Sequence, residues 1–395
     1  MASGSRARPR LLVLGAGPAQ VGLLRAGRER GVFTIAVDRD PGAPGFAYAD
    51  KRALVSTEDE PAVDRLARAE EVDGVVSPGA DWPVAVAARV ADRLGLPHPI
   101  SPATAALVTS KGRQREALAA AGVPQPRLLD EPVPPCVIKA PDRQGQRGLA
   151  IVREEEELPA AIEAALDASR GGSFLAEELV EGPEVTVVAV SSGGEFHPLT
   201  VNDRLTAEPP AFGVALAHAW PSTAACDPET QAAVVAAARA AAEAVGLAEG
   251  PTYTQLRLGA DGPRVIELAA RLGGGHDAEL VELATGVRLN DLALDFALAG
   301  TASVSVPQSS TGPGGACVLF LVPPEGVLRA VEGLEEARSA DGVADVRIYR
   351  KPGHRFGPFR VGADRAGAVL ATGSSRDDAL ERARRAAAAI RFVVE

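Results

Sequence analysis

The sequence PTYTQLRLGADGPRVIELAARLGGGH, residues 251–276, decides the fold. Two segments with alternating apolar and polar residues flank the turn-forming residues GADGP at 259–263, and this pattern predicts a β-hairpin. If the turn centres near Asp261, Gln255 on the first strand lies opposite Glu267 on the second. The hairpin therefore brings an amide oxygen and a carboxylate to one place.

Strand alternation puts Ala269 and Arg271 on the same face as Glu267. A hard cation such as Mg²⁺ prefers oxygen ligands and usually takes one or two side chains together with water and substrate phosphates. Gln255 and Glu267 supply that minimum, so the hairpin predicts a cation site. The alternative is a solvated hairpin face, because polar side chains are mostly exposed.

Length and composition limit the classes of protein. A chain of 395 residues is too long for one ordinary domain, so we expect about two to four compact units. Its 41 Lys and Arg against 52 Asp and Glu give a net charge of −11, so we expect no nucleic-acid partner. No apolar run approaches the roughly 20 residues that cross a bilayer, which argues against a membrane partner. Three scattered cysteines are typical of a reduced cytoplasmic protein: Cys136, Cys226 and Cys317.

Residues 10–108 alternate between strand-like and helix-like segments, which predicts a parallel sheet wrapped by helices. Gly15-Ala16-Gly17 with Asp38 about twenty residues later resembles a dinucleotide fingerprint, but Gln20 stands where the third glycine belongs. A nicotinamide site is therefore the weaker interpretation, and a tight strand-to-helix turn is the alternative. Strand ends in such sheets border a crevice, so we expect Gly17, Asp38 and Asp81 to line a small-molecule pocket.

A short apolar strand at residues 136–138 delivers Lys139 to a glycine-containing loop, residues 140–148. Backbone N–H groups of such a loop can approach phosphate oxygens, and Arg143 and Arg147 add positive charge. Alone, a lysine at a strand end more often extends into solvent. The loop nevertheless predicts a phosphate site.

These segments together resemble the ATP-grasp superfamily. The resemblance rests on four features in order: Lys111, Lys139 with its loop, AEELVEGPEVTV at 176–187, and IELAARLGGG at 266–275. It covers about residues 10–300, and the remainder resembles the C-terminal domain of the L-amino acid ligase branch. The combination is specific, whereas each feature alone is weak.

The resemblance implies an α/β and α+β architecture. We expect a disordered or tag-like start, a Rossmann-like parallel-sheet (preATP-grasp) domain, a lid subdomain, an ATP-grasp C-terminal subdomain with the metal site, and an extra α+β domain. Their expected bounds are 1–9, 10–108, 109–187, 188–300 and 301–395.

The resemblance also implies roles for individual residues. Those expected at the nucleotide are Lys111, Lys139, Gln144, Gly145, Gly148, Glu177, Glu178, Val180 and Glu184, with the loop as lid, Glu177 and Val180 at the adenine and Glu184 at the ribose. Gln255 and Glu267 are expected to hold Mg²⁺, with Mn²⁺ as an alternative. The expected catalytic residues are Arg271, Lys139 and Arg204, and those expected at the substrate are Asp81, His218, Arg271 and Gly274. For His218, a packed structural role is the alternative.

Two positions depart from the common superfamily pattern. Ala269 stands where many members have a metal-binding Asn, and Gln255 replaces the commoner Glu. The Glu-Leu-Ala-Ala-Arg form resembles the amino acid ligase branch, where that Asn is also absent. A second interpretation is a site that binds ATP without catalysis.

The implied function is an ATP-dependent ligase that joins the carboxylate of an amino acid or related acid to an amine through an acyl phosphate, releasing ADP and phosphate. Its partners would be a small-molecule carboxylate and amine, within specialised metabolite or dipeptide biosynthesis, and a homodimer is a further expectation. The alternatives are another ATP-grasp ligase or carboxylase of the purine-pathway or biotin carboxylase kind, a non-catalytic ATP-binding protein, and a dehydrogenase.

Overall fold

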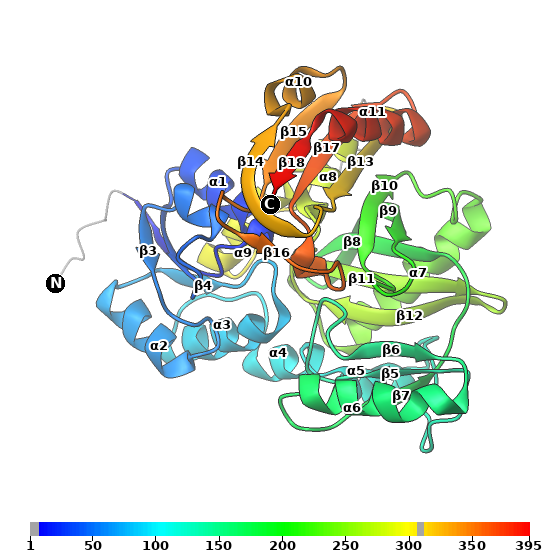
Figure 1. Cartoon of the computed structure of the whole chain (residues 1–395). Helices are drawn as coiled ribbons and strands as arrows, with labels where there is room; N and C mark the ends of the chain where they lie inside the picture. Colours follow the sequence, from blue (N-terminus) through cyan, green and yellow to red (C-terminus); the bar gives the residue numbers. More distant parts are fainter. Residues whose placement is uncertain (1–7, 306–311) are drawn as a thin grey trace.

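The computed structural model describes residues 8–305 and 312–395 (Figure 1). The start predicted for residues 1–9 lies almost wholly outside this part of the chain, as does the middle of the segment between 301 and 315.

A parallel four-stranded sheet forms the N-terminal unit, as predicted. Its order is β3 (Lys51–Ala53), β2 (Phe33–Val37), β1 (Arg10–Leu14) and β4 (Gly74–Val76). Strands β1 and β2 are buried along almost their whole length, because helices cover both faces of a parallel sheet and its strands are continuously apolar. The helical segments of this unit are η1 (Pro18–Gln20), α1 (Val21–Glu29), η2 (Pro44–Ala47), α2 (Glu60–Ala69) and α3 (Asp81–Leu94).

A small antiparallel sheet follows, in the order β6 (Leu149–Val152), β5 (Cys136–Lys139) and β7 (Leu175–Glu178). Ile138 and Ala176 face helix α6 (Leu158–Ala168) in a separate apolar core, so strand alternation turns Lys139 and Glu177 to the opposite face. The other helices of this region are α4 (Pro102–Val108), α5 (Lys111–Ala120) and the 3-10 turn η3 (Glu155–Glu157).

The largest element is an eight-stranded sheet. Its order is β12 (Gly262–Ala269), β11 (Gly250–Gly259), β8 (Glu184–Ser192), β9 (Glu195–Thr206), β10 (Ala215–Trp220), β13 (Gly315–Leu321), β17 (Gly367–Gly373) and β15 (Val343–Ile348). Helix α7 (Pro228–Ala244) packs on one face. On the other face, α8 (Asp277–Thr285) and α9 (Leu289–Ala299) share a core with β1 and α1. This shared core fixes the N-terminal sheet against the hairpin.

The C-terminal residues extend this sheet and add a smaller one. Strand β13 pairs with β10, so the large sheet continues across the unit boundary that we placed at residue 300. Helix α11 (Arg376–Ala389) covers the extension, and Ser375 caps it by accepting a hydrogen bond from Asp378 N. The remaining elements are β14 (Gly326–Glu332), α10 (Leu334–Ser339), β16 (Arg355–Phe356), η4 (Gly362–Asp364) and β18 (Arg391–Val394).

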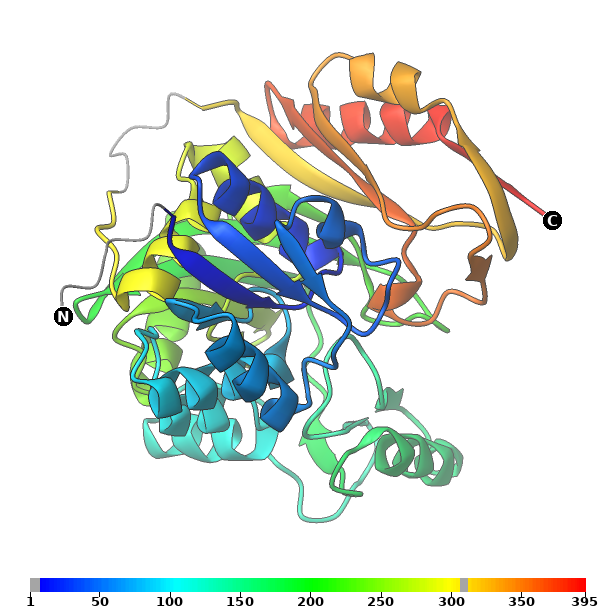
Figure 2. The same cartoon turned by 90° about the vertical axis from the view of Figure 1, so that its left-hand side faces the viewer.

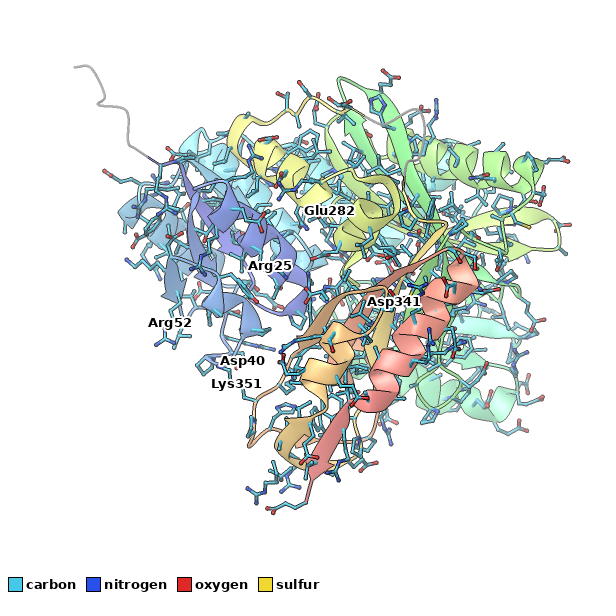
Figure 3. All side chains as sticks on the ribbon, turned by 90° about the horizontal axis from the view of Figure 1, so that it is seen from above. Arg25, Asp40, Arg52, Glu282, Asp341 and Lys351 are labelled. Carbon is cyan, nitrogen blue, oxygen red and sulfur yellow. The ribbon has the colours of Figure 1, made fainter. Side chains whose placement is uncertain are left out.

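Figure 2 shows how these parts are arranged: the C-terminal elements lie at the top, the small sheet with α6 at the bottom, and the N-terminal sheet in front. The N-terminal and C-terminal units also meet directly. Arg25, labelled in Figure 3, is 2.9 Å from a carboxylate oxygen of Asp345 on β15. This ion pair joins the N-terminal unit to the C-terminal end of the large sheet.

Candidate functional site

The predicted hairpin register is confirmed, because Gln255 pairs with Glu267 and the turn consists of the two residues between Gly259 and Gly262. A register shift follows Gln255: Leu256 pairs with Val265, which leaves Ile266 as an extra residue on β12. Such a bulge re-aims neighbouring side chains. Ile266 and Glu267 therefore both line one pocket, and sequence alternation alone had not indicated Ile266.

Glu267 lies among positive charges. Its Oε1 is 3.5 Å from Lys111 Nζ at the start of α5. Burial would raise the pKa of Glu267, but the charges of Lys111, Lys139 and Arg271 outweigh it and hold this pKa below its ordinary value. The carboxylate is therefore ionised near neutral pH, and the excess of positive charge around it suits phosphate groups.

Lys139 ends β5 and is only 4 % exposed. Its Nζ lies 2.6 Å from Glu177 Oε2, and burial lowers its pKa to about 8 although Glu177 opposes this effect. The Glu177 carboxylate also accepts a hydrogen bond from Arg115 Nε at 2.8 Å. The side chain of Glu177 is thus held by two cations, and its backbone pairs with Val137 of β5 and bridges to Leu128 on its other side. Contact of Glu177 with adenine stays a prediction.

Arg115 and Gln114 are structural supports that the sequence analysis missed. Arg115 donates to the carbonyl oxygens of Val265 at 3.0 Å and Ile266 at 2.6 Å. Gln114 bonds both the N–H and the C=O of Leu268, at 2.9 and 2.8 Å. Helix α5 is thereby fixed to β12. The available signal was the spacing of four between Lys111 and Arg115, which puts both on one helix face.

One pocket brings together most of the residues expected at the nucleotide. Its polar side chains are those of Asp81, Lys111, Lys139, Arg143, Gln144, Gln146, Arg147, Glu177, Glu178, Glu184, Arg204, Gln255, Arg257, Glu267 and Arg271, and Gly145 also lines it. Its apolar members include Val137, Leu149, Ile151, Leu179, Val180 and Ile266, which form a slot suited to a flat ring. Gly148 does not line this pocket, but its carbonyl accepts a hydrogen bond from Ala140 N at 2.8 Å and so closes the base of the loop.

Arg204 and Glu184 face each other within this pocket. Arg204 Nη1 lies 2.8 Å from Glu184 Oε1, and both side chains are nearly buried. Arg257 Nη2 approaches the other oxygen of Glu184 at 3.5 Å. The expected ribose-binding carboxylate is thus already held in place by two arginines.

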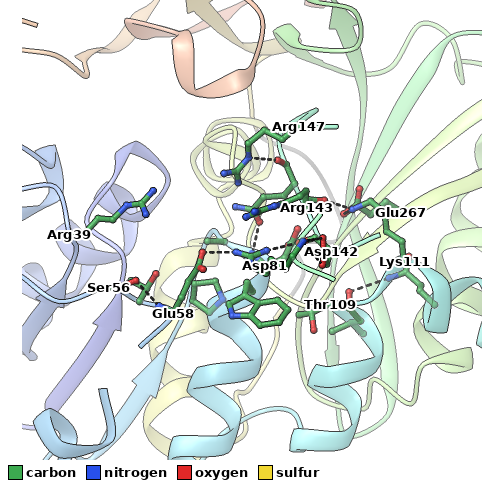
Figure 4. Close-up of a pocket in the computed structure, with 18 of the residues that line it drawn as sticks. Arg39, Ser56, Glu58, Asp81, Thr109, Lys111, Asp142, Arg143, Arg147 and Glu267 are labelled. Atoms are coloured by element: carbon green, nitrogen blue, oxygen red, sulfur yellow. Dashed lines mark hydrogen bonds and ion pairs between the residues drawn. The ribbon is translucent and has the colours of Figure 1, made fainter. Parts of the chain in front are cut away.

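The glycine-containing loop lines this pocket and also a second one toward the N-terminal sheet, which Figure 4 shows. Gln144 Oε1 accepts a hydrogen bond from Asp81 N at 2.6 Å. Lys111 Nζ donates to the carbonyl oxygen of Arg143. Arg271 pairs with Asp81, which also lines both pockets. The loop is therefore fixed beside Lys111 by contacts from two units.

His218 and Gly274 occupy different environments. His218 is 2 % exposed, its Nδ1 is 2.7 Å from Asp277 Oδ1, and it lines neither of these two pockets. His218 packs closely against the glycines at 273–275, because a Cβ added to Gly275 would lie 2.5 Å from its ring. Gly274 is exposed beside the carbonyl of Gly79. His218 thus supports residues 273–275. Direct contact of His218 or Gly274 with a substrate stays a prediction.

Gly17 was expected beside Asp38 in a pocket. Asp38 and Asp81 do line the second pocket, whereas Gly17 is not among its lining residues. The strand-to-helix turn at residues 15–17 is closed by the Asp38 carboxylate, which accepts a hydrogen bond from Ala16 N at 2.9 Å. The Gln20 side chain packs against Gly15, where a Cβ would lie 2.8 Å from it. The turn is therefore filled by the protein's own side chains.

A small sheet and a large antiparallel sheet that enclose charged residues between them define the ATP-grasp fold. Family models support this assignment: residues 133–279 match the ATP-grasp domain, and residues 319–395 match the L-amino acid ligase C-terminal domain 2. The chain belongs to the ATP-grasp superfamily.

Similar proteins span this superfamily. An L-amino acid ligase from Bacillus licheniformis superposes with a TM-score of 0.82 at 22 % identity, covering 99 % of this chain and 100 % of that one. An N5-carboxyaminoimidazole ribonucleotide synthetase from Thermotoga maritima gives 0.75 at 21 % identity, covering 98 % and 100 %. A formate-dependent phosphoribosylglycinamide formyltransferase from Burkholderia vietnamiensis is 28 % identical over 97 % of this chain and 95 % of its own. Enzymes that catalyse different reactions thus resemble this chain.

No helix within residues 8–305 and 312–395 is both long and apolar enough to cross a membrane.

Proposed function

We propose that the protein is an ATP-dependent ligase that joins the carboxylate of an amino acid or related acid to an amine through an acyl phosphate, releasing ADP and phosphate. The observation that carries this proposal is the convergence of Lys111, Lys139 and Glu267 on one pocket, with Gln255 opposite Glu267. The match of residues 319–395 to an L-amino acid ligase domain favours this branch over the others.

Magnesium fits the residues present. Glu267 offers an ionised, buried carboxylate and Gln255 a neutral oxygen, and phosphate and water oxygens complete the usual set for this ion. When bound, Mg²⁺ neutralises charge on the transferred phosphoryl group. The methyl group of Ala269 cannot serve as a ligand, so the protein itself contributes two side chains.

The residues of the chain have distinct parts in the proposed reaction. Lys111 and Lys139 hold the phosphates in line while a carboxylate oxygen attacks the γ-phosphorus and the bond to ADP breaks. The amine nitrogen then attacks the acyl carbon, the carbon–oxygen bond to phosphate breaks, and the ammonium releases a proton. Arg271 stabilises the oxyanion of this step. The loop at 140–148 excludes water from the acyl phosphate.

Substrate-dependent nucleotide release tests the proposal directly. With Mg-ATP, amino acids and amines, we expect ADP and phosphate together with an amide product identified by mass spectrometry. AMP in place of ADP, or no turnover over a broad panel, would contradict it.

Two other functions have specific support. A purine-pathway type of reaction is favoured by the relative from Burkholderia vietnamiensis, which covers nearly the whole chain. ATP binding without catalysis is favoured by Ala269. Turnover with formate or bicarbonate would identify the purine-pathway type of reaction. Tight ATP binding without ADP release would identify the non-catalytic protein. The unit bounds, a homodimer and a cytoplasmic location stay predictions.

A further inference from the structure

The second cavity adjoins the nucleotide pocket on the side of the N-terminal sheet (Figure 4). Lys111 and Glu267 line both cavities, so the second one opens onto the proposed phosphate and cation end. Arg39 and Arg170 line only the second cavity. A molecule in it can therefore reach the reacting groups at one end and Arg39 at the other.

Three arginines of this cavity, Arg39, Arg143 and Arg147, form what we call the arginine cluster. Within residues 8–305 and 312–395, none of them has a carboxylate at ion-pair distance. Arg147 donates from Nε to the carbonyl of Gln144 at 3.1 Å, Arg143 donates to that of Ala168, and Arg39 makes no hydrogen bond in this part of the chain. None of the three is therefore paired with a carboxylate, although the charge of Glu58 acts on Arg147 and opposes the lowering of its pKa. Arg143 and Arg147 also line the nucleotide pocket, whereas Arg39 does not.

The cluster's charges act on one another. Partial burial lowers the pKa of Arg147, and the charges of Arg143, Arg170 and Arg39 lower it further. Figure 4 shows Arg39 extending from the N-terminal unit toward Arg147 on the loop. Like charges held together in this way favour the binding of an anion between them.

Five acidic residues also line the cavity, and each has partners outside the cluster: Asp38, Glu58, Asp81, Asp142 and Glu267. Asp38 accepts from the N–H groups of Ala16 and Asp40 at 2.9 and 3.0 Å. Asp142 accepts from the N–H groups of Arg170 and Gly171 at 2.9 and 3.1 Å.

Glu58 is 2.5 Å from Arg170 Nη2, and this arginine also lies 4.4 Å from the centre of the Trp82 ring. Arg170 is thus a fixed wall of the cavity. The hydroxyl groups of Ser56 and Thr57 line the same end and can donate hydrogen bonds. Guanidinium and hydroxyl groups together match carboxylate or phosphate oxygens.

We infer that the substrate filling this cavity carries a second anionic group, a carboxylate or a phosphate, which binds Arg39 and Arg147 while its reacting end lies at Lys111 and Glu267. This inference rests on the proposed function, since it names the substrate class of the same site. Binding of ATP phosphates alone does not account for Arg39, because this residue does not line the nucleotide pocket.

Matched substrates test the inference with the full chain and Mg-ATP. Serine is compared with O-phosphoserine, and glutamine with glutamate. In the first set of assays these amino acids are the carboxylate substrates and alaninamide is the amine. In the second set their α-carboxamides are the amine substrates and alanine is the carboxylate. We expect kcat/KM to be at least about tenfold higher for the anionic member in one of the two roles. The preferred pair distinguishes phosphate from carboxylate, and the preferred role distinguishes acid from amine.

Arg39→Gln provides the residue-specific test. We expect it to remove at least about tenfold of this preference through KM of the anionic substrate, with KM for ATP unchanged. Arg52→Gln is the matched control, since Arg52 is an exposed arginine on β3 of the same sheet and lines neither cavity. It is expected to retain the preference.

The outcomes separate the inference from the proposed function. ADP formation at equal rates with neutral and anionic substrates contradicts the inference alone. No ADP with any pair contradicts the proposed function, and calorimetric titration of O-phosphoserine then decides the inference. Binding that is lost in Arg39→Gln but kept in Arg52→Gln supports it, whereas equal binding, or none, overturns it.

Discussion

Two groups of charged residues meet at this site, and they differ in how their charges are balanced. In the buried charge cluster, Lys139 and Arg115 both lie within hydrogen-bond distance of Glu177, and all three residues are at most 4 % exposed. In the arginine cluster, the cations lack carboxylate partners in the described residues and border a cavity. Both cations of the first group already have a carboxylate partner, whereas the cations of the second group have none in the described residues.

Because of this difference, we expect the two groups to have different roles. Buried ions require partners of their own, because water is absent and an unpaired charge costs several kcal/mol. The buried charge cluster can therefore fix α5, β7 and the hairpin before nucleotide arrives. Groups that are open to solvent tolerate a missing partner, so the arginine cluster can stay available for a substrate.

Removing Glu177 tests the buried side of the comparison and is expected to have the largest effect. Glu177→Ala leaves Lys139 and Arg115 buried without their anion, and we expect the free energy of unfolding to fall by about 3–5 kcal/mol. Chemical denaturation measures this. Glu178→Ala is the control, because its partner Arg127 is 76 % exposed and such pairs contribute about 0–1 kcal/mol. Equal losses in the two variants would show that the cluster does not stabilise the fold.

Glu267 tests whether the pocket is catalytic. Glu267→Gln keeps the shape of the side chain but removes the charge that holds the cation, and we expect kcat to fall about 10²–10³-fold. Steady-state ADP release measures it. Glu243→Gln, an exposed position on α7, is the control and should retain full activity. Normal turnover by Glu267→Gln would refute the assignment of the site.

The sequence predicted the parts of the site that depend on local pattern. Period-two alternation around a glycine-containing turn was enough to pair Gln255 with Glu267, and an apolar strand before a glycine-containing loop was enough to find Lys139. The parallel N-terminal sheet followed from the alternation of strands and helices.

The parts that it missed depend on contacts between distant segments. Arg115 supports Ile266 across 151 positions of sequence, and no local pattern reveals such a pair. The bulge at Ile266 exists only in the paired strands. Similarly, β17 joins the large sheet because β13 and β15 flank it, although its own sequence, GAVLATG, contains few strong strand formers. Arg39 and the loop at 140–148 border one cavity only in the folded chain.

Titration of Lys139 should make both ADP binding and the free energy of unfolding depend on pH. Its pKa of about 8 in the folded chain lies below its ordinary value of 10.5, so the ammonium group loses its proton as the pH rises through 8. We expect the Kd for ADP to rise above pH 8, by up to about tenfold per pH unit if binding needs the charged form. The sign for stability is opposite: the cost of burying the charge is relieved between pH 8 and 10.5, so this group's contribution to the free energy of unfolding grows there.

The variant Lys139→Arg tests whether Lys139 is the group whose titration weakens ADP binding above pH 8. An arginine stays charged throughout this range, so its pH profile for ADP binding should be flat between 8 and 10. Calorimetric titrations at several pH values provide the measurement. The same rise in Kd for both proteins would locate the titrating group elsewhere.

Arg39 should give the smallest effect on stability and so completes the comparison. Because it is exposed and has no ion pair in the described residues, we expect Arg39→Gln to change the free energy of unfolding by no more than about 0.5 kcal/mol. The double variant Arg39→Gln/Arg147→Gln should be at least as stable as the unaltered protein, because it relieves repulsion between the two cations. Urea denaturation without substrate measures both. A loss comparable with that of Glu177→Ala would mean that these arginines are part of the framework, and the contrast between carboxylate-paired and unpaired cations would not hold.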